Sequence, residues 1–175
     1  FCFSGGFSVN AALGGARSTF SVDQDADAIA LAKENFTLNG LPASQHDFLA
    51  ADVYELLESF KREGRKFDLV VLDPPAFAKS QKAVESALAG YASLNRQALS
   101  VLKSGGLLCT ASCSARVSSQ SFFDAVKEGA HKVGVDITLV EERYQSADHP
   151  VRLQFREGKY LKFFVLRGRR TSRAD

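Results

Sequence analysis

Residues 67–72 (Phe-Asp-Leu-Val-Val-Leu) constrain the fold most, because they are apolar at nearly every position. A strand with one solvated face would alternate apolar and polar residues, so this run predicts a strand that is buried on both faces. Such strands occupy the centre of parallel sheets. Asp73-Pro74-Pro75 follows directly, and the two prolines predict an extended, rigid loop at the end of the strand.

Strand-like and helix-like segments alternate along the rest of the chain. We predict strands at residues 18–22, 45–49, 67–72, 107–111, 137–144 and 160–166, and helices at residues 26–39, 53–63, 83–102 and 121–133. Asp25 is expected to cap the first of these helices, and the glycines at 40, 64 and 105–106 are expected to end helices. This alternation is typical of an α/β fold with a largely parallel sheet.

The length and composition suit one ordinary globular domain without a membrane span. The chain has 175 residues and a net charge of +2, which is too small to indicate nucleic acid by itself. The arginines near the end are expected to form a solvated tail; they are Arg167, Arg169, Arg170 and Arg173. The chain lacks methionine and starts on an apolar stretch, so we interpret its N-terminus as a cut inside a longer protein.

Three cysteines are an odd number, and none of them has Cys-x-x-Cys spacing. This pattern argues against a disulfide framework and against a zinc site, and it favours a reducing, cytoplasmic setting. No metal site is predicted.

Ligands of α/β sheets bind beyond the carboxyl ends of the strands, so the residues after each strand are the candidates. Ser4-Gly5-Gly6-Phe7 follows a truncated first strand and is either a ligand-binding turn or a plain tight turn. It is not Gly-x-Gly-x-x-Gly, so the dinucleotide fingerprint is absent and a nicotinamide oxidoreductase is disfavoured. Asp23, 18 residues beyond Gly5, could accept hydrogen bonds from ribose hydroxyls or cap a helix. Asp52 could bind an adenine amino group or cap the next helix.

The two later strand ends carry the residues that suit chemistry on a base. Asp73 is placed to orient an amino group or ring nitrogen, and Phe77 offers a ring on which a base could stack. Lys79 and Lys82 could contact phosphates, or they could belong to a solvated loop. Cys113 follows the next strand as a candidate nucleophile, whereas Cys109, inside that strand, is interpreted as a small apolar residue.

These motifs together resemble class I methyltransferases, and more narrowly the bacterial large-subunit ribosomal RNA cytosine-C5 methyltransferases related to RlmI. The match covers essentially the whole chain. Its motifs are Phe3-Ser4-Gly5-Gly6-Phe7-Ser8-Val9, Ser21-Val22-Asp23, Asn35, Asn39-Gly40, Asp52-Val53, Leu72-Asp73-Pro74-Pro75-Ala76-Phe77, Tyr91, Leu94-Asn95, Ser112-Cys113-Ser114, Ala147-Asp148-His149-Pro150-Val151 and Glu157-Gly158-Lys159-Tyr160-Leu161-Lys162. Ala115-Arg116-Val117 departs from the family, whose members often have glycine after the position of Ser114.

The resemblance implies a Rossmann-like fold with a mostly parallel seven-stranded sheet, helices on both faces and a truncated first strand. It implies that residues 1–175 are the catalytic domain and that the family's N-terminal PUA and linking domains lie outside this chain. The cofactor would be S-adenosylmethionine and the substrate a cytosine of 23S-type ribosomal RNA. A cytoplasmic homodimer is expected.

The site residues follow from the same motifs. Catalysis is expected from Cys113, which would add to C6 of the cytosine, and from Asp73, with His149 as a candidate neighbour of the thiol. Cofactor contacts are expected from Phe3, Ser4, Gly5, Gly6, Phe7, Asp23, Asp52, Asp73 and Pro74, and substrate contacts from Pro75, Phe77, Lys79 and His149. Two alternatives stay open: methylation of a guanine nitrogen in ribosomal RNA, and a non-catalytic remnant that binds S-adenosylmethionine or RNA.

Overall fold

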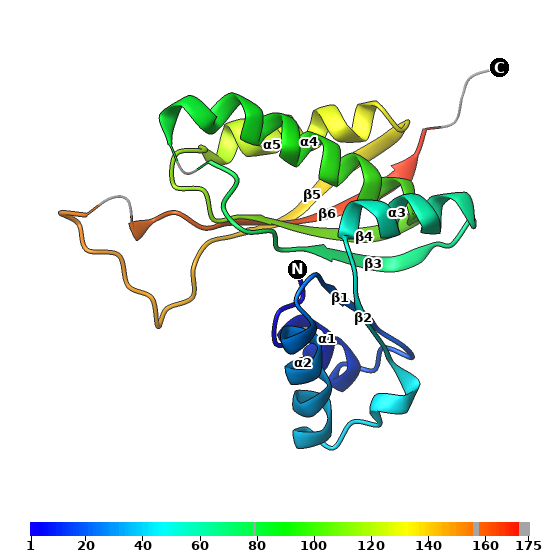
Figure 1. Ribbon diagram of the computed structural model, residues 1–175. Helices are drawn as coiled ribbons and strands as arrows, with labels where there is room; N and C mark the ends of the chain where they lie inside the picture. Colours follow the sequence, from blue (N-terminus) through cyan, green and yellow to red (C-terminus); the bar gives the residue numbers. More distant parts are fainter. Residues whose placement is uncertain (79, 156–157, 172–175) are drawn as a thin grey trace. The chain divides into compact units, whose positions relative to one another are not determined.

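The structure is a computed structural model that describes residues 1–78, 80–155 and 158–171 (Figure 1). The chain divides into two compact units, Phe1–Leu56 and Leu57–Asp175. Among the described residues, no helix is both long and apolar enough to cross a membrane.

The first unit holds a two-stranded parallel sheet. Its elements are α1 (Gly6–Leu13), β1 (Phe20–Asp23), α2 (Ala26–Leu38), the short 3-10 helix η1 (Ala43–Gln45), β2 (Asp47–Ala50) and the start of α3 (Val53–Arg62). β1 pairs with β2 from Phe20 opposite Asp47 to Asp23 opposite Ala50. The predicted cap of α2 is confirmed, because the Asp25 carboxylate accepts a hydrogen bond from the Asp27 N–H at 2.9 Å.

The second unit holds a four-stranded sheet in the order β3-β4-β6-β5. Its elements are β3 (Phe67–Leu72), the 3-10 helix η2 (Gln81–Ala83), α4 (Val84–Ser100), β4 (Leu102–Ser112), α5 (Ser119–His131), β5 (Val135–Arg143) and β6 (Lys162–Arg170). β3 and β4 are parallel, whereas β6 runs antiparallel to both of its neighbours. α4 and α5 lie side by side on one face of this sheet (Figure 1).

A row of buried aromatic rings joins these two helices to the sheet. Tyr91 of α4 lies 5.0 Å from Phe122 of α5, and Phe122 stacks on Phe164 of β6 at 5.2 Å between ring centroids. All three side chains are buried. This packing fixes α4, and Tyr91 with it, against the carboxyl end of β4.

The predicted strand at residues 67–72 is confirmed in its boundaries, but its two faces are not both buried within the second unit. β3 lies at the edge of the four-stranded sheet, and 42% of Leu69 is exposed. The apolar run therefore has an unpaired edge among the described residues of the second unit. The described residues form six strands, two in the first unit and four in the second.

The boundary between α4 and β4 also differs from the prediction. The helix ends at Ser100 and the strand begins at Leu102, so Gly105-Gly106 lies inside the strand instead of ending the helix. A Cβ on Gly106 would lie 2.8 Å from the carbonyl oxygen of Asp68. The pairing with β3 shifts register here, and glycine lets the strand bulge against its neighbour.

The arginines expected to form a tail belong instead to β6, which runs to Arg170. The Arg170 guanidinium donates hydrogen bonds to the carbonyl oxygens of Val133, Leu99 and Ser100 at 3.1–3.2 Å. Arg173 lies outside the described residues. The tail was predicted from charge alone, whereas strand pairing with β5 decides the position of these residues.

Candidate functional site

The glycine turn of the first unit leads directly into α1. Gly5 precedes the helix with a φ of +74°, a left-handed conformation that favours glycine. A Cβ at this position would lie 2.8 Å from the Cβ of Ala32 in α2. Residue 5 must therefore be glycine for the turn to pack this closely on α2, and the N–H groups at the start of α1 can then meet an anionic or polar ligand.

One side of this turn is hydrogen-bonded to α2, and the side chains next to the turn are exposed. The Asn35 side-chain amide donates to the carbonyl oxygen of Ser4 at 2.8 Å. Phe3 and Phe7 have exposed side chains, and a Cβ on Gly6 would meet nothing within 4 Å. A hydrogen bond from α2 thus holds the turn, while the space beside Gly6 is unoccupied by other atoms of the described residues.

Asp23 at the end of β1 is anchored by the backbone of the same turn. One carboxylate oxygen accepts a hydrogen bond from the Phe3 N–H at 2.9 Å, and the other accepts one from the Asp25 N–H at 3.2 Å. Partial burial alone would raise the pKa of Asp23, but these hydrogen bonds outweigh it and hold that pKa below its usual range. Asp23 is therefore an ionised acceptor that can also bind hydroxyl groups.

Asp52 has the contacts of a helix cap. Its Oδ1 accepts hydrogen bonds from the Tyr54 N–H at 2.8 Å and the Glu55 N–H at 3.1 Å, at the start of α3. Its Oδ2 accepts one from the Gln24 side chain at 2.6 Å. Of the two interpretations of Asp52, the geometry supports the capping role, and the adenine contact stays a prediction.

The second unit brings Asp73 and Cys113 together at adjacent strand ends. β3 and β4 are parallel, with Leu72 opposite Thr110, so the residues after each strand meet at one edge of the sheet. The Cys113 thiol donates a long hydrogen bond, 3.8 Å, to the carbonyl oxygen of Pro74. Asp73 keeps an exposed carboxylate, while Pro74 is buried and Pro75 exposed.

Both groups are harder to ionise than usual. Partial desolvation raises the pKa of the Asp73 carboxyl, even though its side chain keeps access to solvent. Burial raises the pKa of the Cys113 thiol, and the neighbouring Asp73 charge raises it further. Both effects disfavour the thiolate, which is the reactive form of a cysteine. A nucleophilic Cys113 therefore needs a further group that favours its thiolate.

Phe77 lies against α4. Its ring is 4.6 Å from that of Tyr91, with an angle of 31° between the two planes, and a Cβ on Gly90 would lie 3.3 Å from it. Tyr91 therefore covers one face of the ring. A base could therefore stack only on the other face of the Phe77 ring, and this stacking stays a prediction.

The backbone on both sides of Cys113 is held by a buried polar network. Ser112 Oγ donates to Tyr91 Oη at 3.0 Å, and Tyr91 Oη lies 3.0 Å from Ser114 Oγ. Ser114 Oγ also accepts a hydrogen bond from the Ala78 N–H at 3.2 Å. The loops that follow β3 and β4 are thereby joined to α4 through hydroxyl groups.

Lys162, the first residue of β6, completes this network, and sequence reasoning did not assign it a role. Its side chain is 5% exposed, and Nζ donates to the carbonyl oxygens of Ser114 and Tyr160, both at 2.7 Å. Burial lowers the pKa of Lys162 to about 8. A signal was present in the sequence, because a lysine directly before the apolar run at 163–166 is unusual in a buried strand.

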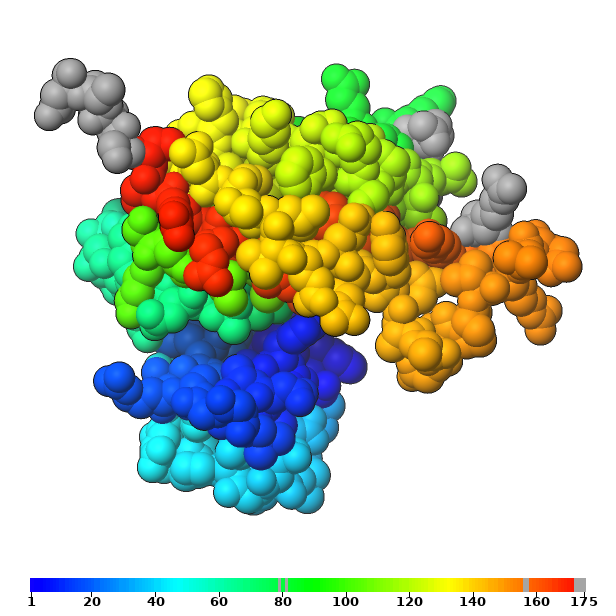
Figure 2. All heavy atoms as spheres, turned by 180° about the vertical axis from the view of Figure 1, so that it is seen from behind, coloured from blue at the N-terminus to red at the C-terminus, as the bar shows by residue number. Residues whose placement is uncertain are grey.

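The remaining predicted substrate residues lie elsewhere or are not described. His149 is 68% exposed, and its Nδ1 lies 3.3 Å from the Asp148 carboxylate. The described part of the connection between β5 and β6 extends away from the sheet in Figure 1 and protrudes from the second unit, in orange, in Figure 2. Lys82 is exposed in η2, and Lys79 lies outside the described residues.

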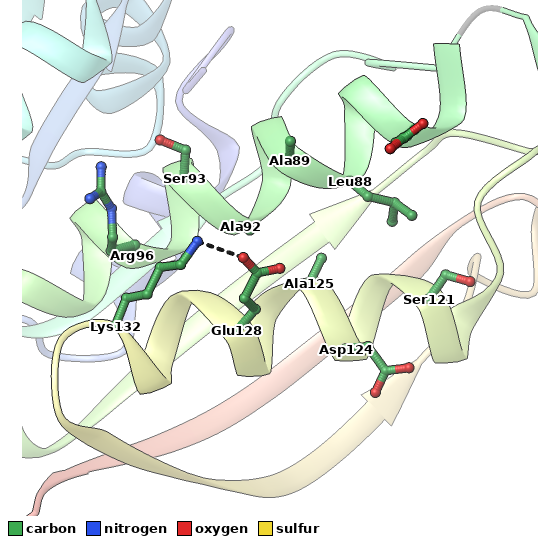
Figure 3. A pocket seen from close by; sticks show the side chains of 11 residues that line it. Leu88, Ala89, Ala92, Ser93, Arg96, Ser121, Asp124, Ala125, Glu128 and Lys132 are labelled. Atoms are coloured by element: carbon green, nitrogen blue, oxygen red, sulfur yellow. Dashed lines mark hydrogen bonds and ion pairs between the residues drawn. The ribbon is translucent and has the colours of Figure 1, made fainter. Parts of the chain in front are cut away.

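A groove of about 620 Å³ lies between α4 and α5 (Figure 3). Its lining mixes small or apolar side chains, such as Leu88 and Ala92, with charged ones that include the Glu128–Lys132 ion pair. No predicted site residue lines this groove. It is a separate feature of the helical layer.

Known proteins resemble the chain in both sequence and fold. The family described as "Conserved hypothetical protein 95" matches residues 1–112. The chain belongs to this family. A ribosomal RNA large subunit methyltransferase I from Salmonella arizonae is 39% identical over 167 residues, which are 95% of this chain and 41% of that protein. The chain thus spans about two fifths of the curated relatives that it matches.

Two solved structures share the fold of the chain. A crystal structure of a protein assigned as a methyltransferase and complexed with SAH has a TM-score of 0.83 and 28% identity. The structure of a Streptococcus mutans protein assigned as a SAM-dependent methyltransferase has a TM-score of 0.82 and 28% identity. Each of the two matches covers 95% of this chain and 43% of the other chain. The predictions of a Rossmann-like α/β fold and of a class I methyltransferase related to RlmI are confirmed.

Proposed function

We propose that this family member transfers the methyl group of S-adenosylmethionine to C5 of a cytosine in large-subunit ribosomal RNA, with Cys113 as the nucleophile. The observation that carries the proposal is the meeting of Asp73-Pro74 and Cys113 at adjacent strand ends, with the Cys113 sulfur 3.8 Å from the Pro74 carbonyl oxygen. The name of the Salmonella relative supports ribosomal RNA as the substrate.

S-adenosylmethionine is the cofactor, and the first unit fits it. The turn at Ser4-Gly5-Gly6 is open at residue 6, and Asp23 is an ionised carboxylate suited to the vicinal hydroxyls of a ribose. Phe3, Phe7, Asp52, Asp73 and Pro74 are the other proposed cofactor contacts. When bound, the cofactor supplies an electrophilic methyl group.

C5 of cytosine is a poor nucleophile, so this chain must activate it. The Cys113 sulfur would form a bond to C6, which moves the electron pair of the C5–C6 double bond towards C5 and lets C5 take the methyl group. A base then removes the C5 proton, the double bond reforms and the thiolate leaves. Asp73 would contact the cytosine edge, where the raised pKa of its carboxyl suits a group that holds a proton near a ring nitrogen.

The rest of the predicted function is part of the same proposal. The catalytic domain is proposed to comprise residues 1–175, and the target base must leave its stack, which suits a loop or a single-stranded segment of RNA. Pro75, Phe77, Lys79 and His149 are the proposed substrate contacts. A cytoplasmic location and a homodimer stay predictions.

The decisive experiment compares Cys113→Ala with Cys109→Ala, because both change a cysteine of the β4 region. The proteins are incubated with labelled S-adenosylmethionine and unmodified ribosomal RNA, the RNA is digested, and the methylated nucleoside is identified. We expect 5-methylcytidine from Cys109→Ala and none from Cys113→Ala, with cofactor affinity kept in both. Full activity of Cys113→Ala would exclude the covalent mechanism, and a methylated guanosine would establish the nitrogen-methylation alternative.

A further inference from the structure

Lys162 is a buried amine that has no role in the proposed mechanism. It is 5% exposed, and among the described residues no carboxylate forms an ion pair with it. Burying an ammonium group without a countercharge is costly, so its position calls for a compensating role. The antiparallel pairing of β4 with β6 sets that position, because Ser112 lies opposite Lys162.

The contacts of Lys162 converge on the residue after Cys113. Nζ donates to the carbonyl oxygen of Ser114 at 2.7 Å, and Ser114 Oγ is bound by Tyr91 and by the Ala78 N–H. The second hydrogen bond of Nζ, to the carbonyl oxygen of Tyr160, ties the amine to the start of β6. An ammonium has three donors, and contacts among the described residues use two of them.

The charge of Lys162 acts on Cys113 as well. Burial and then the Asp73 charge raise the pKa of the thiol, and the Lys162 ammonium acts in the opposite direction and lowers it. Among the described residues, the titratable groups that act on this thiol or contact the adjacent Ser114 come from three elements: Asp73 after β3, Tyr91 on α4 and Lys162 on β6. Of these, Lys162 alone can carry a positive charge at neutral pH.

We propose that Lys162 is a positioning residue for Cys113, which holds the backbone after it through the Ser114 carbonyl oxygen and stabilises the thiolate with its ammonium charge. The proposal rests on the proposed role of Cys113 as nucleophile and deepens it. It also explains how a thiol beside a carboxylate can be activated without a histidine, since the described contacts of His149 are local to its own loop.

The test follows the alkylation of Cys113 by iodoacetamide against pH, read for the Cys113 peptide by mass spectrometry. Only the thiolate reacts, so the pH midpoint reports the pKa of this thiol and needs neither RNA nor cofactor. Lys162→Met removes the charge and keeps an unbranched side chain, and Lys162→Arg keeps the charge. Lys103→Gln is the matched control, because Lys103 is an exposed lysine near the opposite end of β4, paired with Asp68.

We expect Lys162→Met to raise the midpoint by about half to one pH unit, so that the rate at pH 7 falls about three- to tenfold. Lys162→Arg and Lys103→Gln should keep the midpoint of the unchanged protein. Equal midpoints for Lys162→Met and the unchanged protein would overturn the proposal, as would a shift of the same size in Lys103→Gln. Thermal unfolding measured in parallel identifies a variant that has not folded, and Lys162→Gln then replaces it.

A methylation assay separates this proposal from the proposed function. If Cys113→Ala loses methylation while Lys162→Met leaves the alkylation midpoint unchanged, Cys113 keeps its role and Lys162 has none. If the midpoint shifts but Cys113→Ala still methylates RNA, the electrostatic link between the two groups is real and the nucleophile assignment is wrong.

Discussion

Replacing Gly5 with alanine should destabilise the protein by about 2–5 kcal/mol, through two terms that the structure separates. The first is the left-handed backbone, with a φ of +74°, which an L side chain adopts at a cost of about 1–2 kcal/mol. The second is steric, because the new Cβ would lie 2.8 Å from the Cβ of Ala32, well inside normal contact. Overpacking of this kind costs about 1–3 kcal/mol. The melting temperature should fall by at least about 4 °C.

Two glycines near Gly5 serve as matched controls in thermal and urea unfolding. Gly15 has a φ of +92° and no atom within 4 Å of an added Cβ, so Gly15→Ala should show the backbone term alone. Gly6 has neither constraint and lies in α1, so Gly6→Ala should be neutral or stabilise by up to about 1 kcal/mol. Unfolding is measured without cofactor, which keeps ligand binding out of the comparison.

A double-mutant cycle isolates the steric term. Ala32→Gly removes the atom that the new Cβ would meet, so the pair Gly5→Ala and Ala32→Gly should lose less stability than the sum of the two single changes. A coupling of about 1 kcal/mol or more is expected. If Gly5→Ala is no more harmful than Gly15→Ala, and the cycle shows no coupling, then the close approach of the turn to α2 is not what requires glycine.

Three further predictions follow from the hydrogen bonds and charges of the two units. Tyr91→Phe should destabilise by about 1–3 kcal/mol in urea unfolding, because it leaves two buried serine hydroxyls without their shared partner; the exposed Tyr144→Phe should change stability by less than about 0.5 kcal/mol, and equal effects would refute the network. Asp73→Asn should lower the pH midpoint of Cys113 alkylation, since the carboxylate charge raises the pKa of that thiol; an unchanged or higher midpoint would contradict this sign. Asp23 has a lowered pKa in the folded state, so its contribution to stability is present above the unfolded pKa of about 3.9 and is lost as pH falls through the folded value. Asp23→Asn should therefore flatten the acid limb of a stability–pH curve, and a limb of unchanged slope would speak against it.

The local elements were predictable where one short-range signal dominates. Residues 67–72 match β3 at both ends, because a continuous apolar run and a following Asp-Pro-Pro leave few alternatives. Asp25 caps α2 as predicted, since the carboxylate reaches an N–H only two residues away. A prediction failed where one sequence pattern is compatible with two structures. Gly105-Gly106 is typical of a helix end, but here it forms a bulge in β4 where that strand pairs with β3.

The sequence by itself determined which residues stand at the strand ends, and so it pointed to Asp73 and Cys113. Only the tertiary structure decided what surrounds them. Lys162 lies 48 residues from Ser114 along the chain and 2.7 Å from its carbonyl oxygen, because antiparallel pairing of β4 with β6 brings Ser112 and Lys162 opposite each other. Strand order and direction are long-range properties that no local pattern encodes, and here they decide which charge acts on the thiol.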